Sequence, residues 1–480
     1  MSDNPPAYIG FEAYTEQIPS SIPNAVQQAT SRFAGLRAAR VAELPHWESL
    51  RQIGSEIRQH TIDHLDVYLE RLETQVTAAG GHVHWAATAE DARQIVLKIA
   101  RDNNLTLAVK SKSMATEEID LNLALEAAGI EALETDLGEY IIQLAGTGPS
   151  HIIVPAIHLK KEEIAALFRE KLHIDAPEDP VELACIAREI LREKFLNAGM
   201  GISGGNFLVA ETGTLVMVTN EGNGRMVTTM PDLHVAVVGI DKVIPDWDSL
   251  TVFLKLLARS ATGQKISTYT QFITGPRREE GEFGPKEFHL VLLDNGRSKI
   301  LKDPIGRQVF KCIRCGACAN TCPVYQNVGG FAYGWFISGP IGAILAPQML
   351  GTPAARELPY ASTLCGACAD VCPVKIPIPA ILRHLRRRVA EGDEVTQSTM
   401  PLPIRVAAGV TSFAFSWNWL YRVGTLFLPS LMAIFTQKGW MSEAPYPLNL
   451  WTKVRPLPAF TAGFRRWWRN DKNSKVGRDS

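Results

Sequence analysis

The sequence predicts an α/β domain with a largely parallel sheet, followed by a small helical domain organised around cysteines and a helical C-terminal tail. Three observations carry this prediction. Short apolar runs alternate with amphipathic helical patterns through residues 46–300, which is typical of α/β domains. Seven of the eight cysteines lie in two short runs between residues 312 and 372. Residues 404–440 combine Phe, Trp and Leu in a pattern that favours a packed helical hairpin.

Length and composition are those of an ordinary globular protein. A chain of 480 residues favours two to four domains. We expect a loosely structured N-terminal arm over residues 1–45, the α/β domain over 46–300, the cysteine domain over 301–392 and the C-terminal region over 393–480. The chain is 46% hydrophobic with a formal net charge of −1, so no global preference for nucleic acid or acidic partners follows.

Hydrophobic spacing defines the elements of the α/β domain. From Trp47 onward, apolar residues recur at steps of mostly three and four until Gly80-Gly81, which predicts a helix that stops there. The pattern then predicts a strand at Leu105–Val109, a helix over Thr116–Ala128, a strand at His151–Pro155 and a helix over Lys161–Leu172. Lys110 and Lys112 follow the first of these strands, where lysines either bind a carboxylate or phosphate or simply stay solvated.

The next helix has clear start signals. Asp179 is suited to the N-cap, Pro180 to the first helical position, and Glu182 completes a capping-box spacing. We therefore expect a helix over Pro180–Ala198. Cys185, the one cysteine outside the two runs, lies on this helix, and we expect it to be buried as a small apolar residue.

A glycine-rich region runs from Gly201 to Arg225. Strand-like apolar runs lie within and after it, at Phe207–Ala210, Leu215–Thr219 and Leu233–Ile240. Because glycine loops at strand ends let backbone N–H groups approach anions, one interpretation is a small-molecule pocket lined by Glu211, Thr212, Asn220, Glu221 and Arg225. The alternative is a set of hairpin turns with Glu211 and Arg225 on the surface. Neither G-x-G-x-x-G nor a Walker motif occurs, so the sequence supports neither a Rossmann nor a P-loop site.

The first cysteine run reads C-I-R-C-G-A-C-A-N-T-C-P, from Cys312 to Pro323. This is the bacterial ferredoxin pattern, in which thiolates hold iron–sulfur clusters and the fourth cysteine ligates the other cluster of a pair. The second run, C-G-A-C-A-D-V-C-P, begins at Cys365. We therefore expect one [4Fe–4S] cluster on Cys312, Cys315, Cys318 and Cys372, and three corners of a second on Cys322, Cys365 and Cys368.

The second site lacks one thiolate, because Ser362 stands where the standard pattern has a cysteine. The second cluster is then [3Fe–4S], or [4Fe–4S] with a non-cysteine ligand or an open iron, and the serine either ligates iron or caps a turn. Zinc is disfavoured because seven cysteines do not divide into four-ligand knuckles. Disulfides are disfavoured because Met1–Ser31 lacks the charge and apolar core of a signal peptide. We expect a cytoplasmic iron–sulfur protein.

Three later segments flank the cysteines. Val328–Leu350 is uncharged and rich in glycine, and we expect an irregular loop that covers the clusters. Ile378–Glu391 predicts a helix whose arginines form a solvated face or a docking surface for an acidic partner: Arg383, Arg386, Arg387 and Arg388. Residues 404–440 contain no uninterrupted apolar span of about 18–20 residues, so no integral membrane segment is expected. The basic aromatic tail from Phe464 suits contact with an anionic membrane, a subunit contact or a flexible end, and no nucleic-acid module accompanies it.

The order of these features resembles the lactate utilization protein B family. The resemblance covers nearly the whole chain and rests on the glycine-rich α/β domain, C-x2-C-G-A-C-x3-C-P-V-Y, the Gly329–Pro347 segment, S-T-L-C-G-A-C-x3-C-P-V-K-I-P and the Trp-rich tail. It implies a lactate-utilization domain, similar to sugar-phosphate isomerase and CoA-transferase-like folds, joined to a two-cluster ferredoxin-type domain. It also implies one subunit of a three-protein system that oxidises L-lactate to pyruvate.

Three functions stay open at this point. The first is an electron-transfer subunit whose clusters relay electrons, which the absence of flavin and nicotinamide motifs favours. The second is a redox enzyme with its own small-molecule pocket in the α/β domain. The third is a structural scaffold whose clusters only hold the shape of an assembly.

Overall fold

The computed structural model describes residues 10–15, 18, 21–392, 401–446, 449–452, 455–459 and 468. The chain divides into two compact units, Met1–Arg388 and Val389–Ser480. Each unit is described by itself below.

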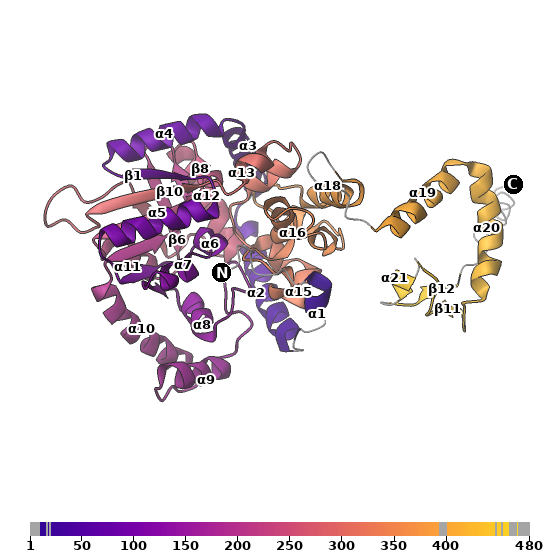
Figure 1. Ribbon diagram of the computed structural model, residues 1–480, viewed down its shortest axis with the longest axis horizontal. Coiled ribbons are helices and arrows are strands. Elements are labelled where there is room, and N and C mark those ends of the chain that lie inside the picture. Colours follow the sequence, from indigo (N-terminus) through magenta and orange to yellow (C-terminus); the bar gives the residue numbers. More distant parts are fainter. Residues whose placement is uncertain are drawn as a thin grey trace. The chain divides into compact units, whose positions relative to one another are not determined.

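A six-stranded parallel sheet lies at the centre of the first unit, in the order β1-β10-β7-β4-β2-β3 (Figure 1). Its strands are β1 (His82–Ala86), β2 (Leu107–Lys110), β3 (Glu131–Glu134), β4 (Met200–Ser203), β7 (Leu233–Gly239) and β10 (Glu287–Leu293). The central strand β7 is buried along its whole length, as strands covered on both faces of a parallel sheet are. The predicted α/β class is confirmed.

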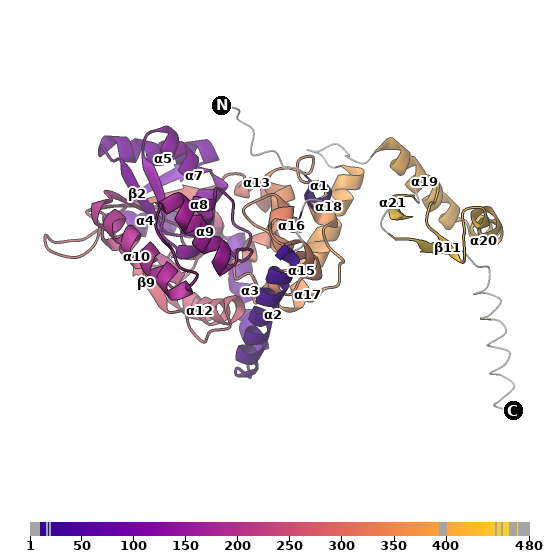
Figure 2. The ribbon, with the colours of Figure 1, turned by 90° about the horizontal axis from the view of Figure 1, so that it is seen from below.

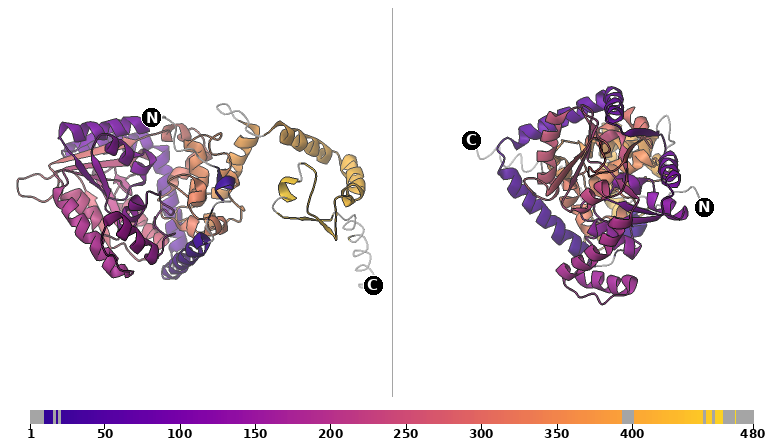
Figure 3. Two further views of the ribbon diagram at one scale, coloured as in Figure 1. Left: turned by 60° about the horizontal axis from the view of Figure 1, so that its bottom comes forward. Right: turned by 90° about the vertical axis from the view of Figure 1, so that its left-hand side faces the viewer.

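Helices cover both faces of this sheet (Figure 3). One face packs on α5 (Ala89–Asp102) and α7 (Leu121–Ala127), which follows α6 (Met114–Glu118). The opposite face, at the β2 end, packs on α8 (Leu137–Ala145), α9 (Lys161–Leu172), α10 (Pro180–Asn197) and α11 (Asn223–Thr229). Ala108 and Val109 are neighbours on β2 and point to these two clusters respectively, because successive strand residues face opposite sides.

A smaller sheet of four strands, ordered β8-β5-β6-β9, packs beside the first. Its strands are β5 (Phe207–Val209), β6 (Thr214–Thr219), β8 (Val243–Ile244) and β9 (Tyr269–Ile273). One face shares a core with α4 (Leu65–Ala78) and with β7 and β10. The other face packs on α3 (Trp47–Asp63) and α12 (Trp247–Ala261).

The cysteine domain shares that last core. It comprises α13 (Arg297–Leu301), η2 (Gly306–Lys311), α14 (Ala317–Asn320), α15 (Pro323–Val328), η3 (Phe331–Tyr333), α16 (Gly339–Met349), η4 (Leu358–Tyr360), α17 (Ala367–Asp370) and α18 (Ile378–Glu391). One hydrophobic cluster runs from Phe207 and Phe253 through Tyr325 to Leu385. Apolar packing is continuous across residue 300, near which we expect one domain to end and the next to begin.

The N-terminal arm is more ordered than we expected. Residues 11–15 form α1 (Phe11–Thr15), and residues 21–42 form one helix, α2 (Ser21–Ala42), which lies alongside α15 (Figure 2). Val26 on this helix is fully buried, and Arg37 donates to the Val371 carbonyl at 2.8 Å. The apolar residues of α2 form no strong stripe, and Val26 and Thr30 are its buried side chains.

The segment His151–Pro155 is not the predicted strand. The Nδ1 atom of His151 accepts from the backbone N–H groups of Ile153 and Val154 at 3.0 and 3.2 Å. The Nε2 atom therefore carries the proton and donates to Asn320 Oδ1 at 3.1 Å. Because one side chain satisfies the backbone donors, the segment needs no neighbouring strand. It instead joins the α/β domain to the cysteine domain.

Two predicted helices are each split in the structure. The Trp47 helix breaks at His64 between α3 and α4. The Thr116–Ala128 helix breaks at Asp120, whose φ of 48° places it in the left-handed region between α6 and α7. A break keeps the same apolar spacing on both sides, so the hydrophobic pattern alone did not reveal it.

Two further predictions were wrong. The glycine-rich segment Val328–Leu350 contains a helix, α16, buried from Gly339 to Pro347, because a helix that is apolar all round can sit inside a core. Cys185 is exposed. The buried face of α10 is formed by Leu183, Ala187, Leu191 and Phe195, and Cys185 lies on another face.

The second unit contains α19 (Leu402–Ser416), α20 (Asn418–Ala433), β11 (Trp440–Met441), α21 (Asn449–Thr452) and β12 (Leu457–Pro458). β11 and β12 pair antiparallel. Val406, Val410 and Phe413 form an exposed apolar stripe along α19, at the spacing of one helix face. Within the part of the chain that the structure describes, no helix is both long and apolar enough to span a bilayer.

Burial of His151 predicts a stability loss in acid. Burial, together with Lys112, lowers the pKa of His151 to about 4 from its ordinary 6.5. Between these values the unfolded chain binds the proton and the folded chain does not, so the free energy of unfolding falls as pH falls. A contribution of about 3 kcal/mol, at 1.36 kcal/mol per pKa unit, is fully present above pH 6.5 and lost as pH falls through 4. Denaturant unfolding of anaerobic protein at pH 7 and pH 5 measures it.

The His151→Gln variant provides the comparison, because an amide still accepts and donates hydrogen bonds but does not titrate in this range. Its loss between pH 7 and pH 5 should be smaller than that of the parent chain. Equal losses in the two proteins would contradict the role assigned to His151.

Candidate functional site

Seven of the cysteines gather in the cysteine domain as free thiols, in two neighbouring groups. The first group is Cys312, Cys315, Cys318 and Cys372, whose charges act on one another. The second group is Cys322, Cys365 and Cys368. Cys368 also acts electrostatically on Cys318, so the two groups lie close together. The last cysteine of each run therefore joins the group of the other run.

Burial makes these thiols poor acids. Burial and then the neighbouring cysteines raise the pKa of Cys315 to about 12, and burial raises that of Cys318 well above its usual range. Burial likewise raises the pKa of Cys368 to about 12 and that of Cys372 to about 11. Thiols in such surroundings ionise only when a cation or a metal compensates the charge.

The two cysteine runs fold into matching turns, displaced by 50 residues. Arg314 and Leu364 both have positive φ, 58° and 56°, and in each case the backbone N–H donates to the side chain two residues earlier. Arg314 donates to Cys312 Sγ at 3.3 Å, and Leu364 donates to Ser362 Oγ at 3.1 Å. Ser362 thus occupies the place of Cys312 in the second turn, and its hydroxyl caps that turn.

These features fit iron–sulfur ligation. Backbone N–H groups point at Sγ, from Arg314 to Cys312 and from Ile376 to Cys372, each at 3.3 Å, as they do around ligated cluster sulfurs. The thiols are unpaired, and six of the seven lie in or against an apolar core, whereas Cys365 is exposed. Among the described residues, no three or more His, Cys, Asp or Glu side chains are arranged to hold a single metal ion.

Arginines from the N-terminal helices bring positive charge to the cysteines. Arg51 on α3 donates to the carbonyls of Cys372 and Ala369, at 2.9 and 3.3 Å, and its charge favours the Cys372 thiolate. Arg37 on α2 favours the Cys315 thiolate in the same way. No motif marks these two arginines, and sequence analysis missed them. Cation charge within a few ångströms of a thiolate stabilises its anionic form.

A buried arginine, Arg58, fastens the cysteine domain to the α/β domain. Its side chain is 2% exposed and donates to the carbonyls of Val243 at 2.7 Å and Phe310 at 2.6 Å, and also to that of Asp241. Helix α3 is thereby tied to β8 and η2. Burial lowers the pKa of Arg58 to about 10, so the guanidinium stays charged at neutral pH.

An ion network adjoins this contact. Asp241 pairs with Arg297 at 2.7 Å, Lys242 at 3.5 Å and Arg314 at 3.9 Å, and Arg297 also pairs with Glu118 at 2.7 Å. Burial alone would raise the pKa of Asp241, but these cations hold it well below its usual range. The network reaches the cysteines, because Cys312 acts electrostatically on Lys242.

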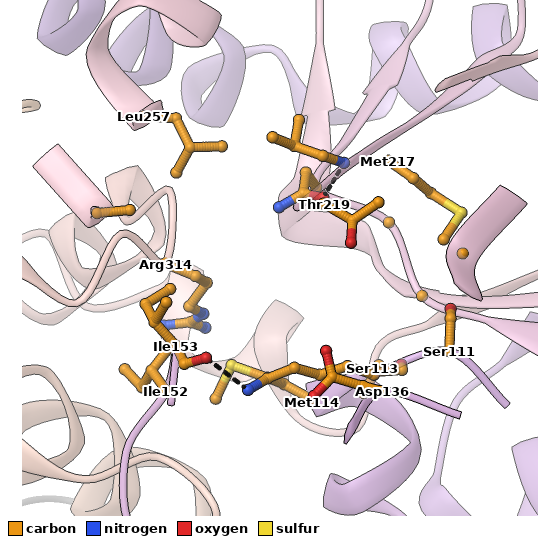
Figure 4. Close-up of a pocket in the computed structure, with 18 of the residues that line it drawn as sticks. Ser111, Ser113, Met114, Asp136, Ile152, Ile153, Met217, Thr219, Leu257 and Arg314 are labelled. Atoms are coloured by element: carbon orange, nitrogen blue, oxygen red, sulfur yellow. Dashed lines mark hydrogen bonds between the residues drawn. The ribbon is translucent and has the colours of Figure 1, made fainter. Parts of the chain in front are cut away.

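A cavity of about 440 Å³ opens between this network and the parallel sheet (Figure 4). Arg314 and Ile153 project into it from one side, and Ser111 and Met217 from the other. Its walls come from the residues after β2, β3 and β4, from the end of β7, from α12 and from the Cys312–Cys315 loop. Ligands of parallel α/β sheets bind at this carboxyl edge of the strands.

The predicted pocket residues divide into two sets. Asn220 and Glu221 line the cavity. Glu211, Thr212 and Arg225 do not line this cavity. The reason is the antiparallel pairing of β5 with β6, which places Glu211 and Thr212 at the opposite end of the hairpin from Asn220.

The three residues outside the cavity lie in other surroundings. Glu211 accepts from the Trp247 N–H at 3.2 Å, and Thr212 exchanges a hydrogen bond with Thr214 at 2.7 Å. Arg225 is exposed on α11. The alternative of hairpin turns therefore describes this end of the region.

The two lysines after β2 have different environments. Lys110 is fully buried and pairs with Glu134 at 2.6 Å, so the solvated interpretation was wrong for it. Against the cost of burial, Glu134 and Glu117 raise the pKa of Lys110. Lys112 lines the cavity and donates to the Ile153 carbonyl at 3.2 Å, with Glu139 3.3 Å away.

Two carboxylates face each other in the cavity wall. Asp136 and Glu221 both line it, and Glu221 accepts from the Leu137 N–H at 3.2 Å. Partial burial and then Asp136 raise the pKa of Glu221 to about 7, although the side chain keeps contact with solvent. Glu221 can therefore hold or release a proton near neutral pH.

Comparison with known proteins assigns both parts of the chain. Residues 69–293 match the LUD domain and residues 308–376 match the 4Fe-4S dicluster domain. A solved structure of a DUF162 family protein from Deinococcus radiodurans is similar over 48% of this chain and 98% of its own, with a TM-score of 0.28 and 14% identity.

Relatives of known name align along nearly the whole chain. Lactate utilization protein B of Macrococcus caseolyticus is 45% identical over 471 residues, covering 96% of this chain and 98% of the relative. Lactate utilization protein B of Bacillus subtilis is 43% identical over 474 residues, covering 97% and 98%. The sequence, the LUD and dicluster domains and these relatives agree: the chain belongs to the lactate utilization protein B family.

Proposed function

We propose that this chain is an electron-transfer subunit that carries two iron–sulfur clusters and takes part in the oxidation of L-lactate to pyruvate. The supporting observation is the gathering of seven free, mostly buried thiols in two adjacent groups. Cys312, Cys315, Cys318 and Cys372 would ligate one [4Fe–4S] cluster. Cys322, Cys365 and Cys368 would hold three corners of the second.

Such clusters supply one-electron exchange at potentials set by local charge, hydrogen bonds and burial. The chain's own residues set these conditions. Arg37 and Arg51 place positive charge beside the thiolates. The buried helix α16 packs in the same core as Cys315, Cys322, Cys368 and Cys372 and shields them from water.

The names of the relatives indicate a lactate-utilization system of more than one protein, and we propose two companion subunits that remove electrons from lactate and pass them on. Free thiols stay reduced in the cytosol and form disulfides in oxidising compartments, which supports a cytoplasmic location. A second candidate function is a redox enzyme with its own small-molecule site. The cavity supports this candidate because it adjoins the loop that carries Cys312 and Cys315.

Replacing Cys315 should interrupt the relay. The Cys315→Ala variant loses one ligand of the first cluster, so the anaerobically purified protein should contain roughly half the iron of the parent chain. Lactate-dependent reduction of a dye by the three-protein mixture should fall at least about tenfold, since removing one cluster breaks the electron path. Iron content and dye reduction are measured on the same preparations.

Cys185→Ala is the matched control, because Cys185 is exposed on α10 and outside both groups. It should keep full iron and full activity. Activity of the parent chain alone, without companions, would favour the enzyme. Unchanged mixture activity of a folded Cys315→Ala protein would favour the scaffold over the relay.

The second cluster site offers a test of its own. Because Ser362 Oγ occupies the place of Cys312 Sγ in a matching turn, Ser362→Cys should add a fourth thiolate without altering the backbone. Mössbauer and EPR spectra should shift toward a fully cysteine-ligated [4Fe–4S] cluster, and iron content should not decrease. Spectra identical to those of the parent chain would contradict an open or serine-ligated corner.

We also propose that the second unit contacts an anionic membrane surface. Its helices expose Phe413, Trp419 and Phe427 together with Arg405 and Arg422. Exposed aromatic residues beside cations are the composition of interfacial helices. The basic tail from Phe464, which prompted this prediction, lies outside the described residues except for Trp468.

Vesicle sedimentation tests this surface with the full chain. Binding should rise with the phosphatidylglycerol content of phosphatidylcholine vesicles and fall with added salt, because salt screens surface charge. Phe413→Glu should weaken it at least about threefold. Phe283→Glu is the control, since Phe283 is 99% exposed in the first unit. Binding to companion subunits and not to vesicles would show that a protein surface covers these helices instead.

A further inference from the structure

The cavity described above joins the two chemically distinct parts of the first unit. Ser111, Gly204 and Gly239 bring the carboxyl ends of three parallel strands to it. Ile313 and Arg314 bring the loop between Cys312 and Cys315. A molecule bound there would touch the α/β domain and the cysteine loop at once. No role assigned so far to the cysteines requires such a space.

The size of the cavity argues against lactate as its occupant. Lactate has six non-hydrogen atoms and needs on the order of 100 Å³, with a water taken as about 30 Å³. The cavity is about 440 Å³, which lies in the range of sites for ring-sized ligands, ~300–1,000 Å³. A three-carbon acid would leave most of it filled with water.

Several polar atoms in the wall have no partner. Ser111 Oγ, Asn223 Oδ1 and Arg314 Nη1 make no hydrogen bond within the part of the chain that the structure describes. Ser111 is 3% exposed and Asn223 is 6% exposed, and both residues line the cavity. Buried polar atoms are normally satisfied, so these atoms point to a ligand that would satisfy them.

The end of the cavity near the cysteines carries excess positive charge. Lys242, Arg297 and Arg314 line it, against Glu118 in the wall and Asp241 behind it. Three cations thus face two carboxylates, and one guanidinium nitrogen of Arg314 is free of hydrogen bonds to the described residues. An acidic group on the ligand would restore the balance with charge-assisted hydrogen bonds.

Part of the cavity wall is apolar. It is formed by Ile152, Ile153, Val154, Leu257, Phe336 and Ile337. Such side chains favour a flat hydrocarbon or aromatic body. The cavity therefore combines an acid-binding end, a wall for a ring system and unpaired hydrogen-bonding atoms.

We propose that this cavity binds a flavin-sized aromatic anion, with its acidic group on Arg314 and Lys242 and its ring system against Ile153 and Phe336. This inference deepens the proposed electron-transfer function and rests on it, because the choice of a flavin assumes that electrons from a hydroxy acid reach the clusters. A hydroxy acid gives up two electrons together, iron–sulfur clusters carry single electrons, and flavin rings exchange electrons in both ways.

Flavin mononucleotide is the probe, because it is an aromatic phosphate whose fluorescence reports binding. Titration of the anaerobic holoprotein should show saturable binding of one equivalent, by calorimetry and by fluorescence. Arg314→Gln should weaken this binding at least about tenfold, as expected for loss of a charge-assisted hydrogen bond. Its iron content should be checked against the parent chain, because Arg314 lies in the cysteine loop.

Leu257→Trp tests the same cavity from a residue outside the cysteine loop. Leu257 projects into the cavity from α12, so an indole there should fill it and weaken binding at least about tenfold, with iron unchanged. Leu196→Trp on the exposed face of α10 is the matched control, since Leu196 is 57% exposed. It should bind flavin mononucleotide as the parent chain does.

Three results would overturn the proposal: no saturable binding of flavin mononucleotide, binding that Leu257→Trp leaves unchanged, or displacement of the probe by millimolar lactate. The last result would identify a lactate site instead. These failures are separable from failure of the relay. If the probe does not bind but lactate-dependent dye reduction still requires Cys315, the cavity inference falls and the electron-transfer function stands.

Discussion

The buried guanidinium of Arg58 is the contact on which the junction between the two domains depends. It donates to the backbone carbonyls of Asp241, Val243 and Phe310. One side chain thus joins α3 to two segments, residues 241–243 and η2, that are far from it in sequence. A buried cation that lost these carbonyls would be unsatisfied and costly. The cysteine turns, the ion network of Asp241 and the wall of the cavity all lie next to this junction.

Positively charged side chains lie around the buried thiols. Arg37 and Arg51 come from the N-terminal helices, whereas Lys242 and Arg314 come from the α/β domain and the cysteine loop. The cysteines therefore lie between positive charges of different origin. Helix α2, far from the motifs in sequence, brings Arg37 to this place because it packs against α14 and α15.

Features that depend on neighbouring residues in the sequence were predicted correctly. The parallel α/β class follows from apolar periodicity, and the helix at Pro180 follows from Asp179, whose carboxylate accepts from Val181 and Glu182. The same reasoning proposed Asn220 and Glu221 as pocket residues, but it did not propose Ser111, Asn223 or Arg314. They meet only because strands β2 and β4 end at one edge and the cysteine loop folds against it, and no short pattern encodes that meeting. The apolar run after His151 suggested a strand for a related reason. Its backbone N–H groups donate to the His151 side chain and not to a neighbouring strand, and the apolar pattern does not show this.

The exchange of the last cysteine between the two runs has a consequence for biosynthesis. The first group contains Cys372, which follows Cys312 by 60 residues. On a ribosome, three thiols of that group emerge well before the fourth, and the second group is likewise divided around the α16 segment. The first site is incomplete in a nascent chain until residue 372 has left the exit tunnel, and the second until residue 368 has, so metal loading of both follows the synthesis of most of the first unit.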